Sequence, residues 1–319
     1  MAEEKVMEGV NTSPSTALEW FDTMTRSAKD KNYHGRFIYM NHNEVRSIDI
    51  IHAKKEVEYE KIEHLSGKPY QIIRHGEELY CLEESGKWMK MNRAELLNEV
   101  AFIQPIEQVE KLSSYYQIQK IGSSRVAGRN AIAIEFEPTD SYRYVHRFWI
   151  DKESGLMLKY NIYEPEKPLK KPLEMIEYVL LETNVPFDPM EFNIPPSFEA
   201  MMEEKLKTEE KTAPNTNEDW QIEWVPPGFI QIDTQTSWSV KNKGTGIVLN
   251  KTYSDGLSMF TLFIQHRPDL KKNKITKMGV TTVVEWSYDA QSQTWITVMG
   301  DLPSDAAIKI VSSVVKKTL

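Results

Sequence analysis

The chain has a single cysteine, Cys81, among its 319 residues, so no disulfide can form within it. We interpret Cys81, in the expected strand GEELYCLEE, as a small buried apolar side chain, because no nearby base or cation would activate its thiol. No run of about 18 apolar residues occurs, so no membrane-spanning helix is expected. Acidic residues outnumber basic residues, which gives a formal net charge of −8. This balance argues against nucleic-acid binding, which needs a basic face.

Catalytic signatures are also missing. The chain has no GxSxG elbow and neither of the glycine-rich nucleotide fingerprints, GxGxxG and GxxxxGK. Carboxylates alternate with lysines, as in EKIEHLSGK, which is typical of a solvated strand face, although spacing alone leaves a glycosidase pair open. We therefore predict that the protein is not an enzyme and uses no cofactor.

Histidines gather near the start of the chain, which raises the alternative of a metal site. There is no HxH, HExxH or CxxC, and each histidine falls at the end of a different expected strand or in a turn. We interpret them as strand-end residues and expect no metal. Five of the seven histidines in the chain belong to this group: His34, His42, His52, His64 and His75.

The first 15 residues, MAEEKVMEGVNTSPS, are polar and are expected to be a flexible N-terminus. They lack the charged start and apolar stretch of a signal peptide. The beginning of the chain thus fits either a cytosolic protein or an exported protein whose leader is not included.

Residues 16–198 are expected to form one mainly β domain. Thr16 and Glu19 fit a capping box for a first helix, after which apolar residues recur with a period of two. Gly67, Gly76 and Gly86 mark hairpin turns between short strands, the pattern of an antiparallel meander. A helical stretch, residues 93–112, interrupts the meander before more strands follow. We predict one large, strongly curved antiparallel sheet with these helices against its concave face.

A second, smaller domain is expected over residues 220–319, after a charged linker at 199–219 that has almost nothing to bury. The second domain reads as several strands followed by a helix that begins at Ser304. The whole chain is therefore predicted to be mainly β (α+β), with two domains.

One face of the large sheet should be apolar. Phe37 and Tyr39 share one side of their strand, and Ile48 and Ile50 share one side of the next. Bulky, β-branched and aromatic residues continue the series, as a sheet with one buried face requires. The series continues with Tyr59, Ile72, Leu79 and Trp88.

Several motifs carry a resemblance to known families. FWIDKESGLMLK, residues 148–159, predicts a hairpin in which Asp151 and Gly155 make the turn, and it is similar to a signature of the bacterial lipoprotein carriers of the LolA and LolB type. ALEWFDTMTRSAKDKNYHGRFIY and YEKIEHLSGKPYQIIRHGEELYC resemble the RseB/MucB family, as do WVPPGF, YSDGLSMFTLFI and TWITVMGDLP in the second domain. The matches come in the family's order, from about Ala17 to the last helix.

The resemblance implies a periplasmic, non-enzymatic negative regulator of the sigma-E envelope-stress response. Its first domain would be an unclosed β half-barrel wrapped around helices. Family members bind the periplasmic part of the anti-sigma factor RseA and shield it from the protease DegS. Lipopolysaccharide, through its lipid A portion, is the implied releasing signal. The family also self-associates, so a homo-oligomer is expected. The alternative is a periplasmic lipid or lipoprotein carrier, although a carrier would need only the first domain.

Candidate binding residues follow from this implied role. The apolar face, with Phe148 added, would hold acyl chains, and its alternative interpretation is ordinary core. Lipid phosphates need cations, and two lysine-rich loops offer them, although solvated loop charge is the simpler interpretation of both. The candidate phosphate-contacting residues are Arg267, Lys271, Lys272 and Lys274 in one loop and Lys170 and Lys171 in the other.

The RseA contact is expected in the second domain, which has five of the eight tryptophans of the chain. Exposed tryptophan is a frequent interface anchor. Asp255 and Gly256 predict a tight turn, which either contacts the partner or only joins two strands. Movement of the domains about the linker could then couple lipid binding to RseA release. The candidate partner-binding residues are Trp224, Phe229, Tyr253 and Asp255.

Overall fold

The computed structural model describes residues 14–42, 44–82, 86, 88–91, 109–166, 169, 171–194, 220–233, 246–289 and 291–316. The predicted linker and residues 93–108 of the predicted helical interruption lie outside these residues, and so do the exact domain boundaries. We call residues 14–194 the large domain and residues 220–316 the small domain. No helix among the described residues is both long and apolar enough to cross a membrane.

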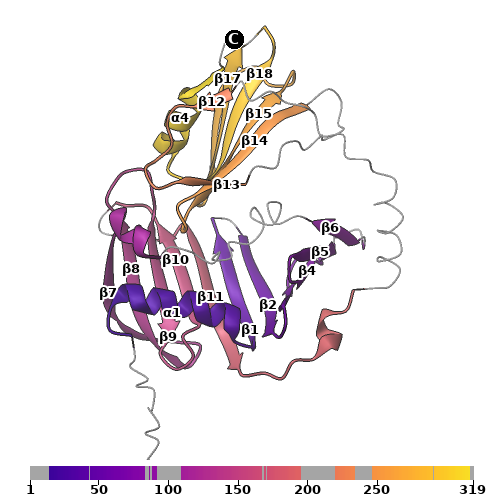
Figure 1. Ribbon diagram of the computed structural model, residues 1–319, viewed down its shortest axis with the longest axis vertical. Helices are drawn as coiled ribbons and strands as arrows, with labels where there is room; N and C mark the ends of the chain where they lie inside the picture. Colours follow the sequence, from indigo (N-terminus) through magenta and orange to yellow (C-terminus); the bar gives the residue numbers. More distant parts are fainter. Residues whose placement is uncertain are drawn as a thin grey trace, which may run out of the picture.

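The large domain is built on an 11-stranded antiparallel sheet with the order β6-β5-β4-β3-β2-β1-β11-β10-β9-β8-β7. The sheet curves strongly and its two outermost strands, β6 and β7, are not paired with each other, so it is an unclosed half-barrel (Figure 1). The predicted fold class is therefore confirmed. The strands are β1 (Tyr33–Asn41), β2 (Glu44–Lys54), β3 (Glu58–His64), β4 (Gln71–His75), β5 (Glu78–Leu82), β6 (Trp88–Met91), β7 (Tyr116–Val126), β8 (Arg129–Pro138), β9 (Val145–Asp151), β10 (Met157–Tyr163) and β11 (Glu174–Thr183).

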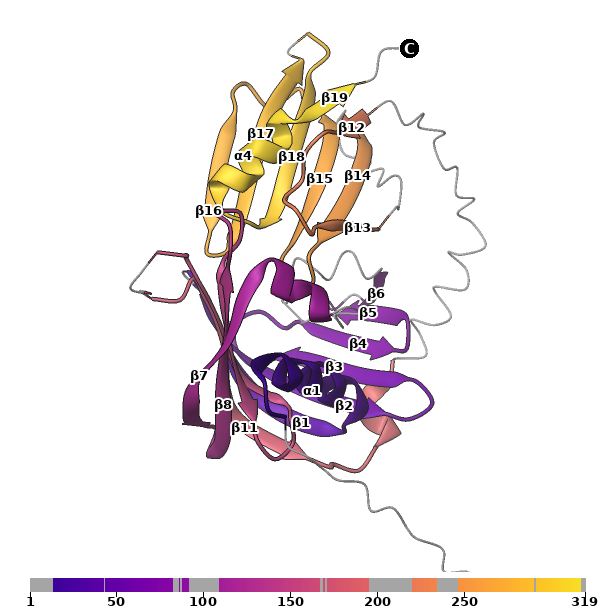
Figure 2. The same cartoon turned by 60° about the vertical axis from the view of Figure 1, so that its left-hand side comes forward.

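Helix α1 (Ala17–Asp30) lies inside the curve of the sheet (Figure 2). The predicted capping box is present: the Thr16 side chain accepts a hydrogen bond from the Glu19 amide, and the Glu19 carboxylate accepts one from the Thr16 amide, both at 3.1 Å. The helix buries Phe21 and Met24, and the Phe21 ring lies 4.7 Å from that of Phe136 on β8. This aromatic contact fixes the helix on the concave face.

The sheet consists of two meanders joined along one seam. The strands β1–β6 run consecutively on one side and β7–β11 on the other. At the seam β1 pairs with β11, with Tyr33 opposite Thr183 and Asn41 opposite Glu174. Two short 3-10 helices pack on the sheet: η1 (Val109–Ser114) against α1 and the outermost strand β7, and η2 (Pro189–Phe192) against β3 and β4.

The hairpin between β9 and β10 forms as its sequence predicts. The Asp151 carboxylate accepts hydrogen bonds from the amide and hydroxyl of Ser154, at 2.9 and 2.6 Å, and Gly155 adopts a φ of +74°. Phe148, Ile150, Leu156 and Leu158 are all buried beside it. A side chain on Gly155 would approach the Ser27 hydroxyl to 2.6 Å, so only glycine lets this turn rest on α1.

We expect Gly155→Ala to destabilise the large domain by about 1–3 kcal/mol, because it adds left-handed strain and a contact with α1. The measurement is the urea unfolding midpoint. Gly67→Ala is the matched control, since Gly67 also has a positive φ, +83°, but has nothing within 4 Å of its added methyl. An equal loss in both variants would show that the contact with α1 contributes nothing.

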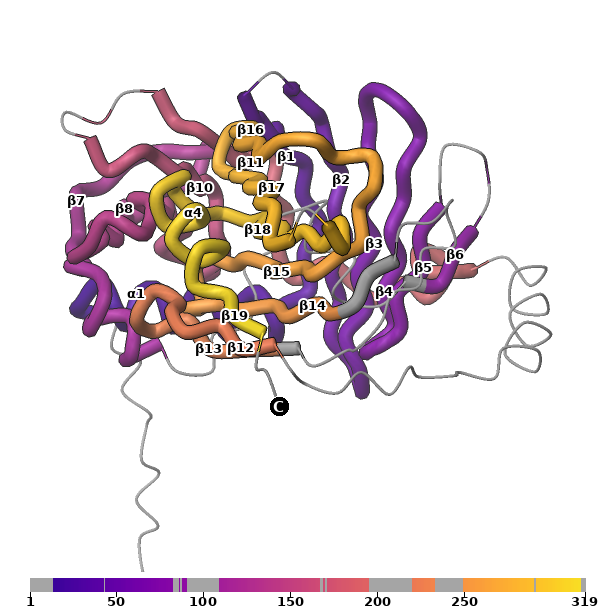
Figure 3. Tube along the Cα trace, turned by 90° about the horizontal axis from the view of Figure 1, so that it is seen from above, coloured from indigo at the N-terminus to yellow at the C-terminus, as the bar shows by residue number. Residues whose placement is uncertain are grey.

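The small domain is a six-stranded antiparallel sheet, in the order β13-β14-β15-β18-β17-β16, covered by α4 (Ser304–Ser312). A two-stranded ribbon of β12 and β19 accompanies it. The small domain lies over the middle of the large sheet, while β5 and β6 extend beyond it (Figure 3). The strands are β12 (Trp220–Ile222), β13 (Ile230–Asp233), β14 (Gly246–Ser254), β15 (Met259–His266), β16 (Lys274–Met278), β17 (Thr281–Asp289), β18 (Thr294–Asp301) and β19 (Val314–Lys316).

Candidate functional site

The predicted lipid-contacting residues divide between the two faces of the large sheet. Six of them are 0–4% exposed in the core on the concave side, and Tyr39 packs against that core: Phe37, Tyr39, Ile48, Ile50, Ile72, Leu79 and Phe148. They pack against α1 and one another, so in this structure they act as core. Their alternative role in holding acyl chains stays a prediction.

The prediction that Tyr59 and Trp88 lie on the concave face with these residues is wrong. Tyr59 is paired with Ala53, and Trp88 with Leu82, so both side chains point to the outer face. There they join a second apolar cluster around Ile73 and Phe192. The residue that continues the inner series on β3 is Ile62, opposite Ile50. Because side chains alternate along a strand, Tyr59, an odd number of positions from Ile62, must face outward.

The predicted phosphate-contacting cations are only partly free. Arg267 donates two hydrogen bonds to the Asp269 carboxylate, at 2.9 and 2.8 Å, and this guanidinium lowers the pKa of Asp269 to about 2. Lys271 donates to the carbonyl of Pro268. Lys272, Lys274 and Lys171 are exposed, and Lys170 lies outside the described residues. Lys277 lies on β16, the strand that follows the Arg267 loop, and pairs with Glu164 of the large domain. The two lysine-rich loops are thus neighbours across the domains.

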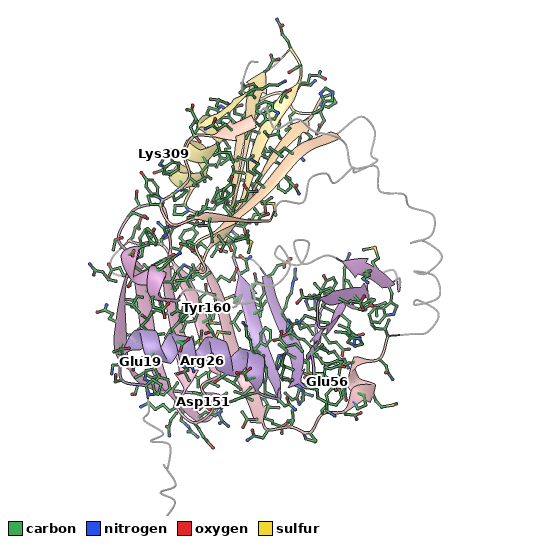
Figure 4. All side chains as sticks on the ribbon, viewed as in Figure 1. Glu19, Arg26, Glu56, Asp151, Tyr160 and Lys309 are labelled. Carbon is green, nitrogen blue, oxygen red and sulfur yellow. The ribbon has the colours of Figure 1, made fainter. Side chains whose placement is uncertain are left out.

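The predicted partner-binding residues do not form one exposed surface in the described arrangement, and their contact with a partner stays a prediction. Phe229 and Tyr253 are buried in the small-domain core, where both rings pack on Phe260. The Asp255 side chain is fully buried. Trp224 alone is half-buried, with the Lys309 ammonium (Figure 4) 4.0 Å from its ring centroid. The sequence does not reveal that the large domain covers the Asp255 turn.

The Asp255 turn joins the two domains through a buried ion pair. Arg143 of the large domain donates from Nε to Asp255 Oδ2 at 2.7 Å, and neither side chain is exposed. The Tyr116 hydroxyl donates to the same oxygen at 3.0 Å. The amides of Leu257 and Ser258 donate to Oδ1, at 2.9 and 2.8 Å. Both carboxylate oxygens are therefore satisfied, as a buried charge requires.

Arg143 has further partners in both domains. Its guanidinium contacts Asp140 of the large domain and the carbonyl of Pro227 in the small domain. The rings of Tyr115, Tyr116 and Phe229 lie 4.9–5.7 Å from its central carbon. A planar cation surrounded by aromatic rings and carboxylates is well held. Arg143 is thus the centre of the joint, and no motif in the sequence identifies it.

Apolar contacts surround this ion pair. Val280, in the turn between β16 and β17, is 2% exposed and belongs to the core of the large domain. Tyr142 of the large domain packs against the core of the small domain. The Tyr144 hydroxyl donates to the carbonyl of Leu302 at 2.9 Å. The domains therefore interlock, and a ligand or partner that separates them must break a buried ion pair and expose apolar surface.

The joint, as far as the structure describes it, does not resemble a metal site. Within the described part of the chain no three His, Cys, Asp or Glu side chains are arranged to hold a metal ion. His146, the histidine nearest to the ion pair, stacks on Tyr160 and shares a 2.7 Å hydrogen bond with its hydroxyl. Burial lowers the pKa of His146 to about 4. It therefore stays neutral at physiological pH and serves as a structural residue.

These features define a class: a two-domain β protein in which a half-barrel is locked to a smaller sheet by a buried ion pair. Comparison with known families is more specific. Residues 16–196 match the MucB/RseB N-terminal domain, and residues 214–315 match the MucB/RseB C-terminal domain. The chain belongs to the MucB/RseB family.

Individual relatives align along nearly the whole chain. The sigma-E factor regulatory protein RseB of Haemophilus influenzae is 27% identical, covering 94% of this chain and 91% of the relative. The sigma factor AlgU regulatory protein MucB of Pseudomonas aeruginosa is 24% identical, with 95% and 92% covered. A solved structure of the Pseudomonas aeruginosa MucA/MucB complex has 21% identity and a TM-score of 0.73, covering 95% of this chain and 99% of that one. The last comparison shows a shared fold.

Proposed function

We propose that this protein is a periplasmic negative regulator of an envelope-stress sigma factor. It binds the periplasmic region of an RseA-type anti-sigma factor and shields that region from DegS, and lipopolysaccharide releases it. The observation that carries the proposal is the family match, which covers both domains in order. Support also comes from the relatives, which are named as sigma-factor regulatory proteins and of which one has been solved with MucA.

The joint between the domains supplies a mechanism for release. A partner that spans both domains requires one arrangement of them, and the Arg143–Asp255 pair holds such an arrangement. A lipid whose phosphates contact the lysine-rich loops would act beside the Lys277–Glu164 pair, which also crosses between the domains. The lipid would bind a different arrangement of the domains more tightly and so lower the affinity for the anti-sigma factor. The effect is reciprocal: the anti-sigma factor would lower the affinity for the lipid by the same factor.

The test is direct binding to the periplasmic region of an RseA-type protein, with and without lipid A, at two salt concentrations. We expect binding that lipid A competes away, and lipid binding that weakens with salt, because exposed charges are screened over about 10 Å at 0.1 M. Replacing Lys271, Lys272 and Lys274 together with glutamine should weaken lipid A binding about tenfold, since each exposed ion pair contributes up to ~1 kcal/mol.

The matched control replaces three exposed lysines of the large domain, Lys29, Lys54 and Lys111, with glutamine, which removes the same charge elsewhere. An equal loss in both triple variants would contradict a specific contribution from the loop. The alternative function is that of a lipid carrier, and the half-barrel is the feature that favours it. Stoichiometric lipid uptake without any binding to the anti-sigma region would support the carrier and overturn the regulator.

A further inference from the structure

Two carboxylates from different domains lie close together at the joint, Glu174 buried and Asp301 half-buried. Glu174 is the first residue of β11 in the large domain, and it is 2% exposed. Asp301 is the last residue of β18 in the small domain, and its charge acts on Glu174. The turn at Gly279, with φ +63°, brings the domains this close, since a side chain there would collide with Asn41 opposite Glu174.

The partners of the two carboxylates are neutral. The Tyr39 hydroxyl of β1 donates to Glu174 Oε2 at 3.0 Å, and Asn41 donates to Tyr39 at 3.2 Å. The other oxygen, Glu174 Oε1, is buried and has no hydrogen-bond partner among the residues that the structure describes. The Thr281 hydroxyl of β17 donates to Asp301 Oδ1 at 3.3 Å. The site can therefore accommodate a proton on either carboxyl group far better than two negative charges.

Other titratable groups near the pair do not neutralise it. Tyr160 of β10 and Tyr144 beside β9 feel the charge of Asp301, and burial raises the pKa of both, so they stay uncharged. His146 is also neutral. Lys277 of β16 lies 5.4 Å from the Tyr144 ring centroid, but it pairs with Glu164. Among the described residues no lysine, arginine or histidine forms an ion pair with Glu174 or Asp301, and the Arg143 guanidinium at the joint is held by Asp255 and Asp140.

We propose that Glu174 and Asp301 make the joint between the domains proton-sensitive, so that it is closed while the pair holds a proton and weakened when both are charged. Two like charges in a buried site repel each other and lack water, and both costs disappear when the domains separate. This device requires no ligand or partner, so it stands independently of the function proposed above.

The direction follows from the protonation of the closed form. Burial and the charge of Asp301 raise the pKa of Glu174 from its ordinary 4.5 to about 8, and burial raises the pKa of Asp301 from 3.8 to about 6. Once the domains separate, both groups return towards their ordinary values in water. The closed form thus binds more protons between about pH 4 and 8. The free energy that favours the closed form over the open form is therefore largest below about pH 4 and decreases as the pH rises from about 4 to 8.

The test measures the distance between the domains by energy transfer between two dyes on the full chain. Glu56→Cys, at the exposed turn between β2 and β3 (Figure 4), and Lys272→Cys in the small domain carry the dyes, in a Cys81→Ser background. We expect transfer efficiency to be constant below about pH 4, to fall as the pH rises from about 4 to about 8, and to be constant again from there to pH 9. Far-UV circular dichroism should stay constant, which separates domain movement from unfolding.

Two variants assign the transition to the pair. Glu174→Gln and Asp301→Asn each replace one carboxyl by a neutral group of the same shape. Glu174→Gln should remove the part of the fall above about pH 6, since only Asp301 then titrates. Asp301→Asn should move the remaining fall to lower pH, because burial alone still raises the pKa of Glu174. Glu182→Gln is the matched control, since Glu182 is exposed on the same strand and should leave the transition unchanged. The proposal is overturned if efficiency is constant in the original protein, if it falls together with the dichroism, or if Glu174→Gln retains the fall above about pH 6.

Discussion

Asp255→Ala should weaken the joint between the domains by about 3 kcal/mol. Removing one partner of a buried ion pair leaves the other charge uncompensated, which typically costs about 3–5 kcal/mol. We expect the lower end because Arg143 keeps its contact with Asp140. The Tyr116 hydroxyl and two backbone amides would also lose their acceptor. Since separation exposes Arg143 to water, the loss should appear as opening of the domains. Energy transfer between labelled domains, followed in urea, measures it.

Asp269→Ala is the matched control for this prediction. Asp269 also pairs with an arginine, Arg267, but its side chain is 55% exposed, so the pair contributes less than about 1 kcal/mol. The joint should therefore open at the urea concentration of the original protein. If Asp255→Ala and Asp269→Ala gave the same small effect, the buried pair would not hold the domains together.

Phe148→Ala should destabilise the large domain by about 3–5 kcal/mol, the usual cost of removing a buried phenylalanine ring. Phe148 is 0% exposed and lies between Phe21 of α1, at 5.1 Å, and Tyr160 of β10, at 4.6 Å between ring centroids. Its loss would leave a cavity where helix and sheet meet. Because whole domains are stable by only about 5–15 kcal/mol, the urea midpoint should fall markedly.

Val179→Ala on β11 is the control, because Val179 is 59% exposed and should change stability by less than about 0.5 kcal/mol. The comparison also decides between two roles for Phe148. A core residue gives the large loss described above. A loss below about 1 kcal/mol, combined with weaker lipid binding, would instead identify Phe148 as the wall of an acyl pocket.

The sequence predicts the large sheet well because its strands are local hairpins. Gly67, Gly76 and Gly155 all adopt the positive φ that their turns require, and the capping box of α1 involves residues only three positions apart. The alternation of inward and outward side chains within one strand does not determine which face a strand of another hairpin presents to the core. Tyr59 and Trp88 were assigned to the wrong face because a strand's face depends on its pairing register, which composition does not specify.

The joint between the domains could not be predicted, because its members are distant in the sequence. Asp255 was expected to form a turn, and it does, but its second carboxylate oxygen binds Arg143 and Tyr116 of the other domain. Nothing in the neighbourhood of Arg143 in the sequence distinguishes it from a solvated arginine. Glu174 and Asp301 likewise resemble ordinary surface acids at strand ends. Only the docking of the small domain brings them together.

The seam between β1 and β11 has a consequence for synthesis of the chain. The β1 strand emerges early from the ribosome and can pair at once with β2, whereas its other neighbour, β11, follows only after the rest of the large domain. Until then one edge of β1 exposes unpaired amides and carbonyls, which is the surface that promotes aggregation. Arg36 and Asp49 on β1 and β2 form an ion pair, and charges of this kind on neighbouring strands discourage wrong pairing during that interval. Protection from aggregation by a chaperone is therefore needed by the nascent chain more than by the folded protein.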